Sequence, residues 1–227
     1  MVAELTASLR ATGLRKSFGS RVVLDLDFEL GPGQFALLLG ENGVGKSTFL
    51  RCLLGLENHP GAVRVDGRPS RGAIVGVLDQ PVMYPSWTGA QNMRYLLNDR
   101  TAPRSAVALR LAGTGLLRMR VGAMSTGQKK MLLLATALAG TASIVLLDEF
   151  ANGLDREARS RFRREVKADL ARGRSFIATG HDLSVFEDLP SRVVVMRSGR
   201  LDDVTAEYER HHDIEGIYET HVVRTRP

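Results

Sequence analysis

Hydrophobic and polar residues follow two different periods along the chain. Residues 21–30 alternate strictly in RVVLDLDFEL, which predicts an amphipathic strand with one buried face. Four shorter runs are apolar almost throughout and are typical of buried strands: QFALLL, SIVLLD, SFIATG and RVVVM. Helical spacing separates these runs, as in residues 47–54 and 156–171. The alternation of strands and helices predicts an α/β fold with a mainly parallel sheet.

Strand signals disappear between Pro81 and Leu138, and helical spacing takes over. The segments with this spacing are TGAQNMRYLLN, RSAVALRLAG and STGQKKMLLLATALAG. We therefore expect a helical subdomain at about residues 81–138, inserted into a core formed by about residues 1–80 and 139–227. The sequence has no internal repeat and no linker that indicates a second independent domain, so we interpret residues 1–227 as a single domain.

Composition limits the function without choosing one. The chain has 227 residues, 44% of them hydrophobic and 25% charged, as in an ordinary globular protein. Its 31 Lys and Arg against 25 Asp and Glu give a net charge of +6, which permits nucleic acid or anionic lipid as a partner but is also typical of a solvated surface. The single cysteine, Cys52, cannot form an internal disulfide, which favours a reducing compartment.

The N-terminus has no apolar core of signal-peptide length, and no segment reaches the roughly 18 uncharged apolar residues of a membrane span. The nearest approach is Met131–Phe150, which Gly140 and Thr141 divide into a helix-length run and a strand that ends in two acids. We therefore expect any membrane role to come through a partner.

The stretch LLLGENGVGKSTFL carries the first chemical motif. Residues 40–47 fit G-x-x-x-x-G-K-[ST], after a predicted strand and before a predicted helix. Glycines let backbone N–H groups turn toward a phosphate, and the helix N-terminus adds partial positive charge. We expect Lys46 to reach the β- and γ-phosphates and Ser47 to ligate Mg²⁺. The motif predicts a nucleoside triphosphate site at Asn42, Gly43, Val44, Gly45, Lys46, Ser47 and Thr48.

An acidic pair closes the apolar strand SIVLLDE. Asp148 and Glu149 stand at its carboxyl end, where ligands bind in open α/β sheets. Asp148 is suited to hold Mg²⁺ through water, and Glu149 is suited to polarise an attacking water. General-base assistance of this kind is worth about 10² to 10⁴ in rate. The alternatives are an acidic pair that merely ends a strand and, for residues 40–47, a glycine-rich turn with an incidental lysine.

With these motifs in place, residues 124–155 resemble the nucleotide-binding domain of ATP-binding cassette (ABC) transporters, and the resemblance extends over nearly the whole chain. The family signature L-S-G-G-Q is similar to Met124-Ser125-Thr126-Gly127-Gln128, with Met124 in the leucine place and Thr126 in the first glycine place. The resemblance implies that Ser125, Gly127 and Gln128 contact the nucleotide of a second copy in a head-to-tail dimer.

The signature segment also has a physical interpretation of its own. Ser125 is a good N-cap for the apolar helix that follows, so its hydroxyl and the helix amides form an anion site. The alternative is that Ser125 serves only as the N-cap, because capping alone is sufficient to explain a serine at this position. Gly127 is suited to close backbone approach to a phosphate.

Four further positions carry roles that the resemblance implies. Gln80 matches the glutamine that senses Mg²⁺ and the attacking water, and His181 matches the switch histidine that contacts the γ-phosphate. Asp155 matches the loop aspartate that crosses the dimer interface, and it is also a candidate N-cap for the next helix. Phe18 takes the place of the aromatic that stacks on adenine. Phe150 departs from the family, which usually has proline there.

The resemblance implies a P-loop NTPase core with a mainly parallel sheet, an N-terminal antiparallel β portion and a helical subdomain insertion. It also implies an ATPase with ATP and Mg²⁺ as cofactors. The implied partners are a transmembrane permease subunit and a second ABC ATPase subunit, which is expected to be another copy of this chain. The implied location is peripheral, at the cytoplasmic face of the cell membrane. Trp87 is expected to line the groove that receives a helix of the membrane subunit, and the alternative is that it packs inside the helical subdomain.

The segment from Gln80 to Ser125 is a short insertion, and no regulatory domain is expected after the last strand. The ending DIEGIYETHV resembles the short acidic-aromatic ending common in cassettes that serve ABC-2-type exporters. This resemblance implies export, with import as the alternative.

Other classes remain open at this point. A P-loop kinase would transfer the γ-phosphate to an acceptor, but it has no use for the signature segment. A non-transport ABC ATPase of the iron–sulfur assembly type or of the nucleic-acid-handling type is a further alternative. Nucleic-acid-handling cassettes carry long insertions or occur in tandem, and neither fits in 227 residues. We therefore expect no nucleic acid as a partner. A degenerate cassette would bind ATP without turnover, against which Glu149 and His181 argue.

Overall fold

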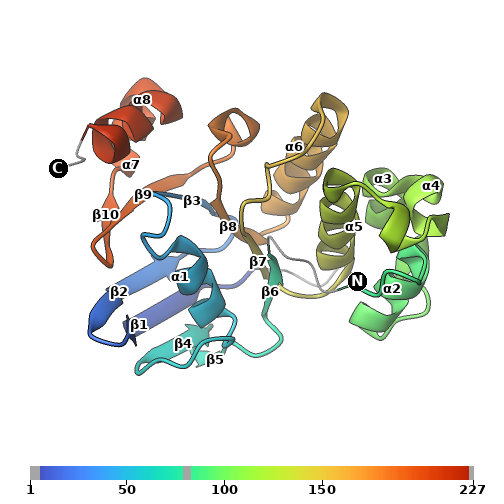
Figure 1. Cartoon of the computed structure of the whole chain (residues 1–227), viewed down its shortest axis with the longest axis horizontal. Helices are drawn as coiled ribbons and strands as arrows, with labels where there is room; N and C mark the ends of the chain where they lie inside the picture. The colour runs from blue at the N-terminus through green and yellow to red at the C-terminus, as the bar shows by residue number, and fades with distance from the viewer. Residues whose placement is uncertain (1–5, 79–82, 225–227) are drawn as a thin grey trace.

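Two β-sheets form the framework of the computed structural model, which describes residues 6–78 and 83–224. The larger has the strand order β10-β9-β3-β8-β7-β6, and the smaller has the order β2-β1-β4-β5 (Figure 1). In the larger sheet all neighbouring pairs are parallel except β9 with β10. Its strands are β3 (Phe35–Leu39), β6 (Ile74–Val77), β7 (Ile144–Leu147), β8 (Ser175–Thr179), β9 (Arg192–Arg197) and β10 (Arg200–Asp203). This arrangement confirms the predicted α/β class with its mainly parallel sheet.

The central strands are apolar throughout because both of their faces are covered. Leu37 and Leu39 of β3 belong to a core that includes the helices on one side, whereas Ala36 and Leu38 belong to a second core on the other side. Alternate residues of β7 and β8 divide in the same way. This two-sided burial explains why the sequence shows continuous apolar runs here instead of alternation.

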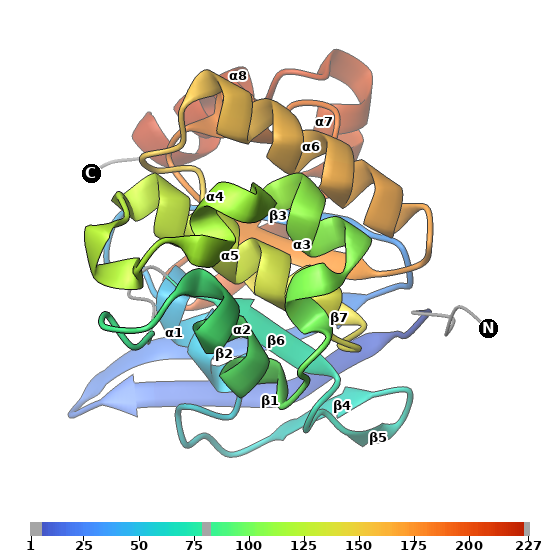
Figure 2. The same cartoon turned by 90° about the vertical axis from the view of Figure 1, so that its right-hand side faces the viewer.

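The antiparallel sheet lies across one face of the larger sheet, with α1 between them (Figures 1 and 2). Its strands are β1 (Leu9–Phe18), β2 (Arg21–Leu30), β4 (Ala62–Val65) and β5 (Arg68–Pro69). Strand β2 buries one side of its alternating pattern, as predicted. The β1–β2 hairpin pairs Phe18 with Arg21 at its tip, so the ring of Phe18 is carried to the edge of the molecule.

Helices cover the remaining face and gather at one end, where α2 to α5 lie together (Figure 2). The helical elements are α1 (Lys46–Leu53), α2 (Gly89–Leu97), η1 (Ala102–Arg104), α3 (Ala106–Leu111), α4 (Gly113–Arg118), η2 (Val121–Ala123), α5 (Thr126–Ala139), α6 (Arg156–Leu170), η3 (Leu183–Phe186), α7 (Thr205–His211), α8 (Ile214–Tyr218) and a π-helix η4 (Glu219–Val223). The predicted stretch RSAVALRLAG forms only α3, because Gly113 takes a φ of 62° and starts a new helix.

A buried arginine ties the end of α5 to the sheet. Arg174, 2% exposed, precedes β8 and donates to the carbonyl oxygens of Leu138 and Gly140 at 3.0 and 2.8 Å. It also pairs with the buried carboxylate of Asp169 at 2.9 Å. The last carbonyls of α5 therefore gain a cation, which complements the helix dipole.

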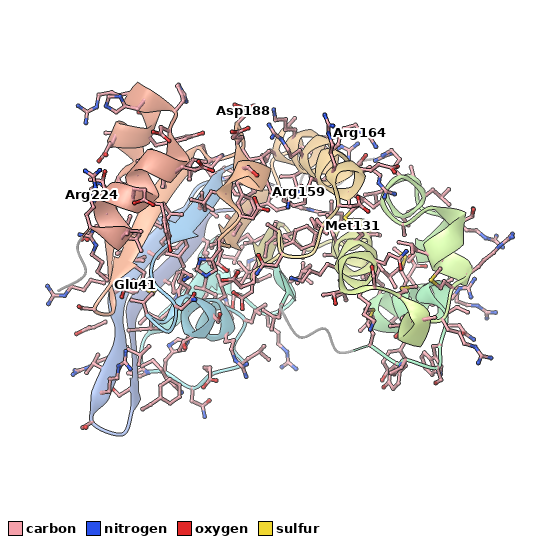
Figure 3. The ribbon with its side chains drawn as sticks, turned by 45° about the horizontal axis from the view of Figure 1, so that its top comes forward. Glu41, Met131, Arg159, Arg164, Asp188 and Arg224 are labelled. Atoms are coloured by element: carbon pink, nitrogen blue, oxygen red, sulfur yellow. The ribbon has the colours of Figure 1, made fainter. Side chains whose placement is uncertain are left out.

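Arg164 of α6 is 61% exposed and is labelled in Figure 3, whereas Arg159, Arg161 and Arg163 of the same helix are half-buried. Arg159 pairs with Asp182, and Arg163 pairs with Glu187 and Asp188. The side chains of Arg159 and Arg163 are 34% and 28% exposed, so these ion pairs lie at the partly solvated surface. No helix within residues 6–78 or 83–224 is long and apolar enough to cross a membrane.

Candidate nucleotide-binding site

The loop after β3 turns sharply into α1. Gly45 is the N-cap of α1 and has a φ of 121°, a conformation that disfavours any side chain. A Cβ on Gly45 would also stand 2.8 Å from Cγ1 of Val23. Because the first N–H groups of a helix have no carbonyl partner within it, the start of α1 is suited to bind an anion.

Lys46 is buried at the first turn of α1, with 6% of its surface exposed. Its Nζ donates to the carbonyl oxygens of Gly40 at 2.7 Å and Glu41 at 3.0 Å. Burial lowers the pKa of Lys46, while the carboxylates of Glu149 and Asp148 oppose this shift. The ammonium is thus held inside its own loop, close to the expected phosphate position.

Ser47 and Asp148 meet although they lie 101 residues apart. The Ser47 hydroxyl donates to Oδ1 of Asp148 at 3.1 Å, and the Thr179 hydroxyl donates to the same oxygen at 2.8 Å. Asp148 follows β7, and Thr179 ends the adjacent strand β8. Hydroxyl and carboxylate oxygens are the ligands that Mg²⁺ prefers, so Ser47 and Asp148 fit the predicted role. In the described part of the chain no three His, Cys, Asp or Glu side chains form a metal cluster.

Glu149 is held by contacts on both its backbone and its side chain. Its φ is 49°, in the left-handed region, and its N–H donates to the Thr179 hydroxyl at 3.1 Å. One carboxylate oxygen lies 3.4 Å from Nε2 of His181, and the other accepts from Asn152 at 2.9 Å. A glutamate and a histidine in such contact are a suitable pair for water activation next to a phosphate.

A cavity of about 310 Å³ connects the phosphate loop with the β1–β2 hairpin. Phe18 is 54% exposed and lines this cavity, and Nζ of Lys16 lies over its ring, 5.1 Å from the centroid. The residues that line this cavity are Phe18, Arg21, Val23, Asn42, Gly43, Gly45, Lys46, Ser47, Thr48 and Glu149. The predicted residue Val44 lines the adjacent cavity of about 480 Å³ instead.

The signature segment lies apart from this cavity, at the start of α5. Ser125 is the N-cap of α5, as predicted, and it forms a capping box with Gln128: the Ser125 hydroxyl accepts from the Gln128 amide at 3.2 Å. The Gln128 side chain accepts from the Ser125 amide at 2.9 Å. Both polar side chains of the signature thus have a local structural role as well.

Asp155 and Phe150 also have structural roles. Asp155 is the N-cap of α6, with its carboxylate accepting from the Ala158 amide at 2.8 Å. Phe150 is fully buried, with its ring centroid 4.9 Å from that of Phe162. The place where the family has proline is therefore filled by a core side chain.

The comparison with known proteins decides the family. A family model described as ABC transporter matches residues 23–152. The chain belongs to the ABC transporter family. This result confirms the resemblance stated from the signature segment and the phosphate loop.

Two named relatives illustrate the range of this family. The chain is 31% identical over 225 residues to the sn-glycerol-3-phosphate import ATP-binding protein UgpC 1 of Rhizobium johnstonii, covering 92% of this chain and 61% of the relative. It is 34% identical over 212 residues to the Nod factor export ATP-binding protein I of Paraburkholderia xenovorans, covering 86% of this chain and 69% of the relative. The chain thus spans about three fifths of the length of the UgpC relatives.

Solved structures agree on the fold. An ATP-binding subunit of an ABC transporter superposes with a TM-score of 0.79 at 21% identity, covering 90% of this chain and 93% of that one. An ABC transporter ATP-binding cassette in its ADP conformation superposes with a TM-score of 0.76 at 21% identity, covering 94% and 97%. The ABC ATP-binding cassette fold is therefore confirmed.

Three residues of the site were not singled out from the sequence, and one predicted residue cannot be placed. Thr179 bridges Asp148 and Glu149, and its position at the end of a buried strand was the available signal. Asn152 and Lys130 contact Glu149 without any sequence signal that distinguishes them. Gln80 lies outside the described residues.

Proposed function

We propose that the chain is the ATP-hydrolysing subunit of an ABC transporter. The observation that carries this proposal is the cavity that the phosphate loop shares with Glu149: Lys46, Ser47 and Glu149 line it together. A triphosphate seated on the loop has its γ-phosphoryl group next to Glu149. The function that this arrangement supports is water attack on that group.

In the proposed reaction, a water molecule attacks the γ-phosphorus, its proton passes to the Glu149 carboxylate, and ADP leaves. His181, whose Nε2 lies 3.4 Å from a carboxylate oxygen of Glu149, would contact the γ-phosphate in this proposal. Lys46 exchanges its two carbonyl partners for phosphate oxygens and stabilises the charge on the equatorial oxygens. Ser47, Asp148 and, from the sequence, Gln80 would hold Mg²⁺, which would neutralise part of the charge of the phosphates.

The site requires a second cassette, for which we propose another copy of this chain. Ser125, Gly127, Gln128 and Asp155 do not line the cavity of their own chain. In a head-to-tail dimer they complete the cavity of the partner copy. Two ATP molecules then lie between the two protomers.

We further propose that a transmembrane permease subunit docks near β6 and α2 and holds the chain at the cytoplasmic face of the membrane. An apolar cavity of about 420 Å³ lies there, lined in part by Ile74, Leu96, Leu97 and Leu133. Trp87 does not line it. Trp87 stacks on Tyr84 instead, with ring centroids 4.4 Å apart, and the third ring of this cluster belongs to Tyr95, which precedes Leu96 on α2.

Charge favours an acidic docking segment. Residues 83–138 contain eight Lys or Arg and one acid, Asp99, so this segment carries +7 where the whole chain carries +6. We therefore propose that the permease docks an amphipathic helix with apolar residues in the cavity and carboxylates around it.

A matched pair of variants tests the docking surface. Leu96 on α2 and Leu109 on α3 are 44% and 45% exposed. Leu96→Asp should abolish co-purification with the permease, and Leu109→Asp should not. Trp87 lies outside the cavity but packs on Tyr84 and Tyr95 next to Leu96, so Trp87→Ala should weaken the complex indirectly. If both Leu96→Asp and Trp87→Ala bind the permease normally, this docking surface is wrong.

For the direction of transport we propose export. Of the two relatives described above, the exporter has the higher identity and is covered over more of its length. The importer relatives make import the second candidate. Cargo uptake into inside-out vesicles upon ATP addition supports export, and uptake into right-side-out vesicles loaded with ATP supports import.

Phosphate release from MgATP by the purified chain tests the reaction itself. Release without any added acceptor is the expected result. A strict requirement for a small acceptor would indicate a kinase, and tight salt-sensitive binding to DNA or RNA would indicate a nucleic-acid-handling cassette.

A further inference from the structure

Lys130 is a buried lysine in the helix that begins with the signature. It lies on α5 and is 1% exposed. Its Nζ donates to the backbone carbonyl oxygen of Glu149. Because a buried ammonium is costly unless it is hydrogen-bonded or paired, this contact constrains the position of both groups.

The backbone of Glu149 needs such a constraint. A φ of 49° is unfavourable for a residue with a side chain and persists where the surroundings fix it. The N–H of Glu149 is fixed by the Thr179 hydroxyl, and its carbonyl is fixed by Lys130. The peptide groups on both sides of the Glu149 Cα therefore have a defined orientation, and this orientation sets the direction of the carboxylate.

These contacts extend a series of hydrogen bonds across the site. Ser47 of the phosphate loop donates to Asp148, and Thr179 joins Asp148 to the Glu149 amide. Lys130 ends the series on α5. The phosphate loop of a chain is thus linked to its own signature helix through the residue proposed to activate water.

We propose that Lys130 is a positioning residue for the Glu149 carboxylate of its own chain. It does not line the nucleotide cavity, so it acts through Glu149. The inference rests on the proposed function, in which Glu149 polarises the attacking water. A displacement of about 1 Å at a reacting group costs up to about 10²-fold in rate.

Three variants provide the first test. Lys130→Met keeps the length of the side chain and removes the donor, and Lys130→Arg restores a donor. Lys129→Met is the matched control, because Lys129 is adjacent on α5 and only partly buried. Lys130→Met should lower kcat for ATP about 10- to 100-fold with the affinity for a fluorescent ATP analogue within twofold of wild type. Lys130→Arg should recover at least part of the rate, and Lys129→Met should retain all of it.

Mixed dimers separate positioning of Glu149 from an effect on the signature. One dimer pairs a wild-type chain with a chain that carries both Glu149→Gln and Lys130→Met. The other pairs a Glu149→Gln chain with a Lys130→Met chain. If Lys130 positions Glu149 of its own chain, the first dimer keeps one working site and the second keeps none. A role through the signature predicts the opposite result.

Wild-type kcat in the Lys130→Met homodimer, or activity in the second mixed dimer but not in the first, would overturn the inference. A fall in melting temperature without the expected pattern in the mixed dimers would assign Lys130 a purely structural role and would also overturn it. Failure of the proposed function is distinguishable, because the wild-type chain itself would then release no phosphate.

Discussion

Gly127 of the signature lies directly against the carbonyl oxygen of Gly153, in the loop that follows the acidic pair. A Cβ on Gly127 would stand 2.3 Å from that oxygen and 3.3 Å from the carbonyl carbon. Both contacts are with backbone, so no change of side-chain rotamer can relieve them. Gly127 therefore has a reason to be glycine within its own chain, in addition to the proposed approach to a phosphate.

Gly127→Ala should displace either the start of α5 or the loop after Glu149. We expect at least a tenfold loss of ATP turnover together with a lower melting temperature. Gly115→Ala is the control, because Gly115 lies in α4 with nothing within 4 Å of an added Cβ. It should stabilise the chain slightly, by about 0.5–1 kcal/mol. Equal behaviour of the two variants in thermal unfolding and phosphate release would contradict the steric argument.

The sequence predicts those parts of the fold and site that depend on local pattern. The strands β3, β7, β8 and β9 are buried on both faces, so each appears in the sequence as a run of apolar residues. A predicted strand followed by G-x-x-x-x-G-K-S is sufficient to place the phosphate loop. The capping box of Ser125 and the N-cap of Asp155 also follow from residues within one turn of each helix start.

The remaining features depend on contacts between distant segments. The sequence alone does not distinguish Lys130 from other lysines on predicted helices. Its role depends on the packing of α5 against the end of β7, which brings Lys130 to Glu149. Thr179 acquires its role only when β8 pairs with β7 and brings its hydroxyl to Asp148, 31 residues away. The break between α3 and α4 depends on a single glycine, Gly113, whose positive φ the helical spacing does not reveal.

Glu149→Gln removes the proposed proton acceptor while keeping the size of the side chain. Turnover should fall by about 10² to 10⁴, whereas ATP-dependent dimer formation should persist because the phosphate contacts remain. Phosphate release and size-exclusion chromatography with ATP measure the two effects separately. Glu157→Gln, at a side chain 83% exposed on α6, should change neither. Turnover of the Glu149→Gln variant at the wild-type rate would refute the assigned role.

Glu165 provides a pH-dependent contribution to stability. Burial alone would raise the pKa of this carboxyl, but hydrogen bonds and charge from Arg110, aided by Arg164, hold the pKa below the ordinary value of 4.5. Because the folded pKa is lowered, the stabilisation is fully present above about pH 4.5 and is lost as the pH falls through the folded pKa. The carboxylate is therefore expected to stabilise the chain at neutral pH.

Urea unfolding of the wild type and Glu165→Gln between pH 7 and pH 3.5 tests this. The wild type should be more stable by about 1.5–3 kcal/mol at pH 7, the range for hydrogen bonds to charged groups. The difference should narrow below about pH 4.5. Glu187→Gln, at a side chain 66% exposed, should show little difference at any pH. A difference for Glu165→Gln that is constant with pH would contradict the lowered pKa.

Asp169 accepts from two arginines that differ chiefly in burial, and this gives a matched comparison. Arg174 and Arg172 each lie 2.9 Å from one of its carboxylate oxygens, but their side chains are 2% and 51% exposed. Arg174→Met removes the buried partner of a buried carboxylate and also removes the cation from the end of α5. It should therefore lower the free energy of unfolding by about 3–5 kcal/mol. Arg172→Met removes a solvated partner and should lower the free energy of unfolding by only about 0–1 kcal/mol. Chemical denaturation at pH 7 measures both, and a cost for Arg172→Met equal to that for Arg174→Met would show that burial does not decide the strength of this cluster.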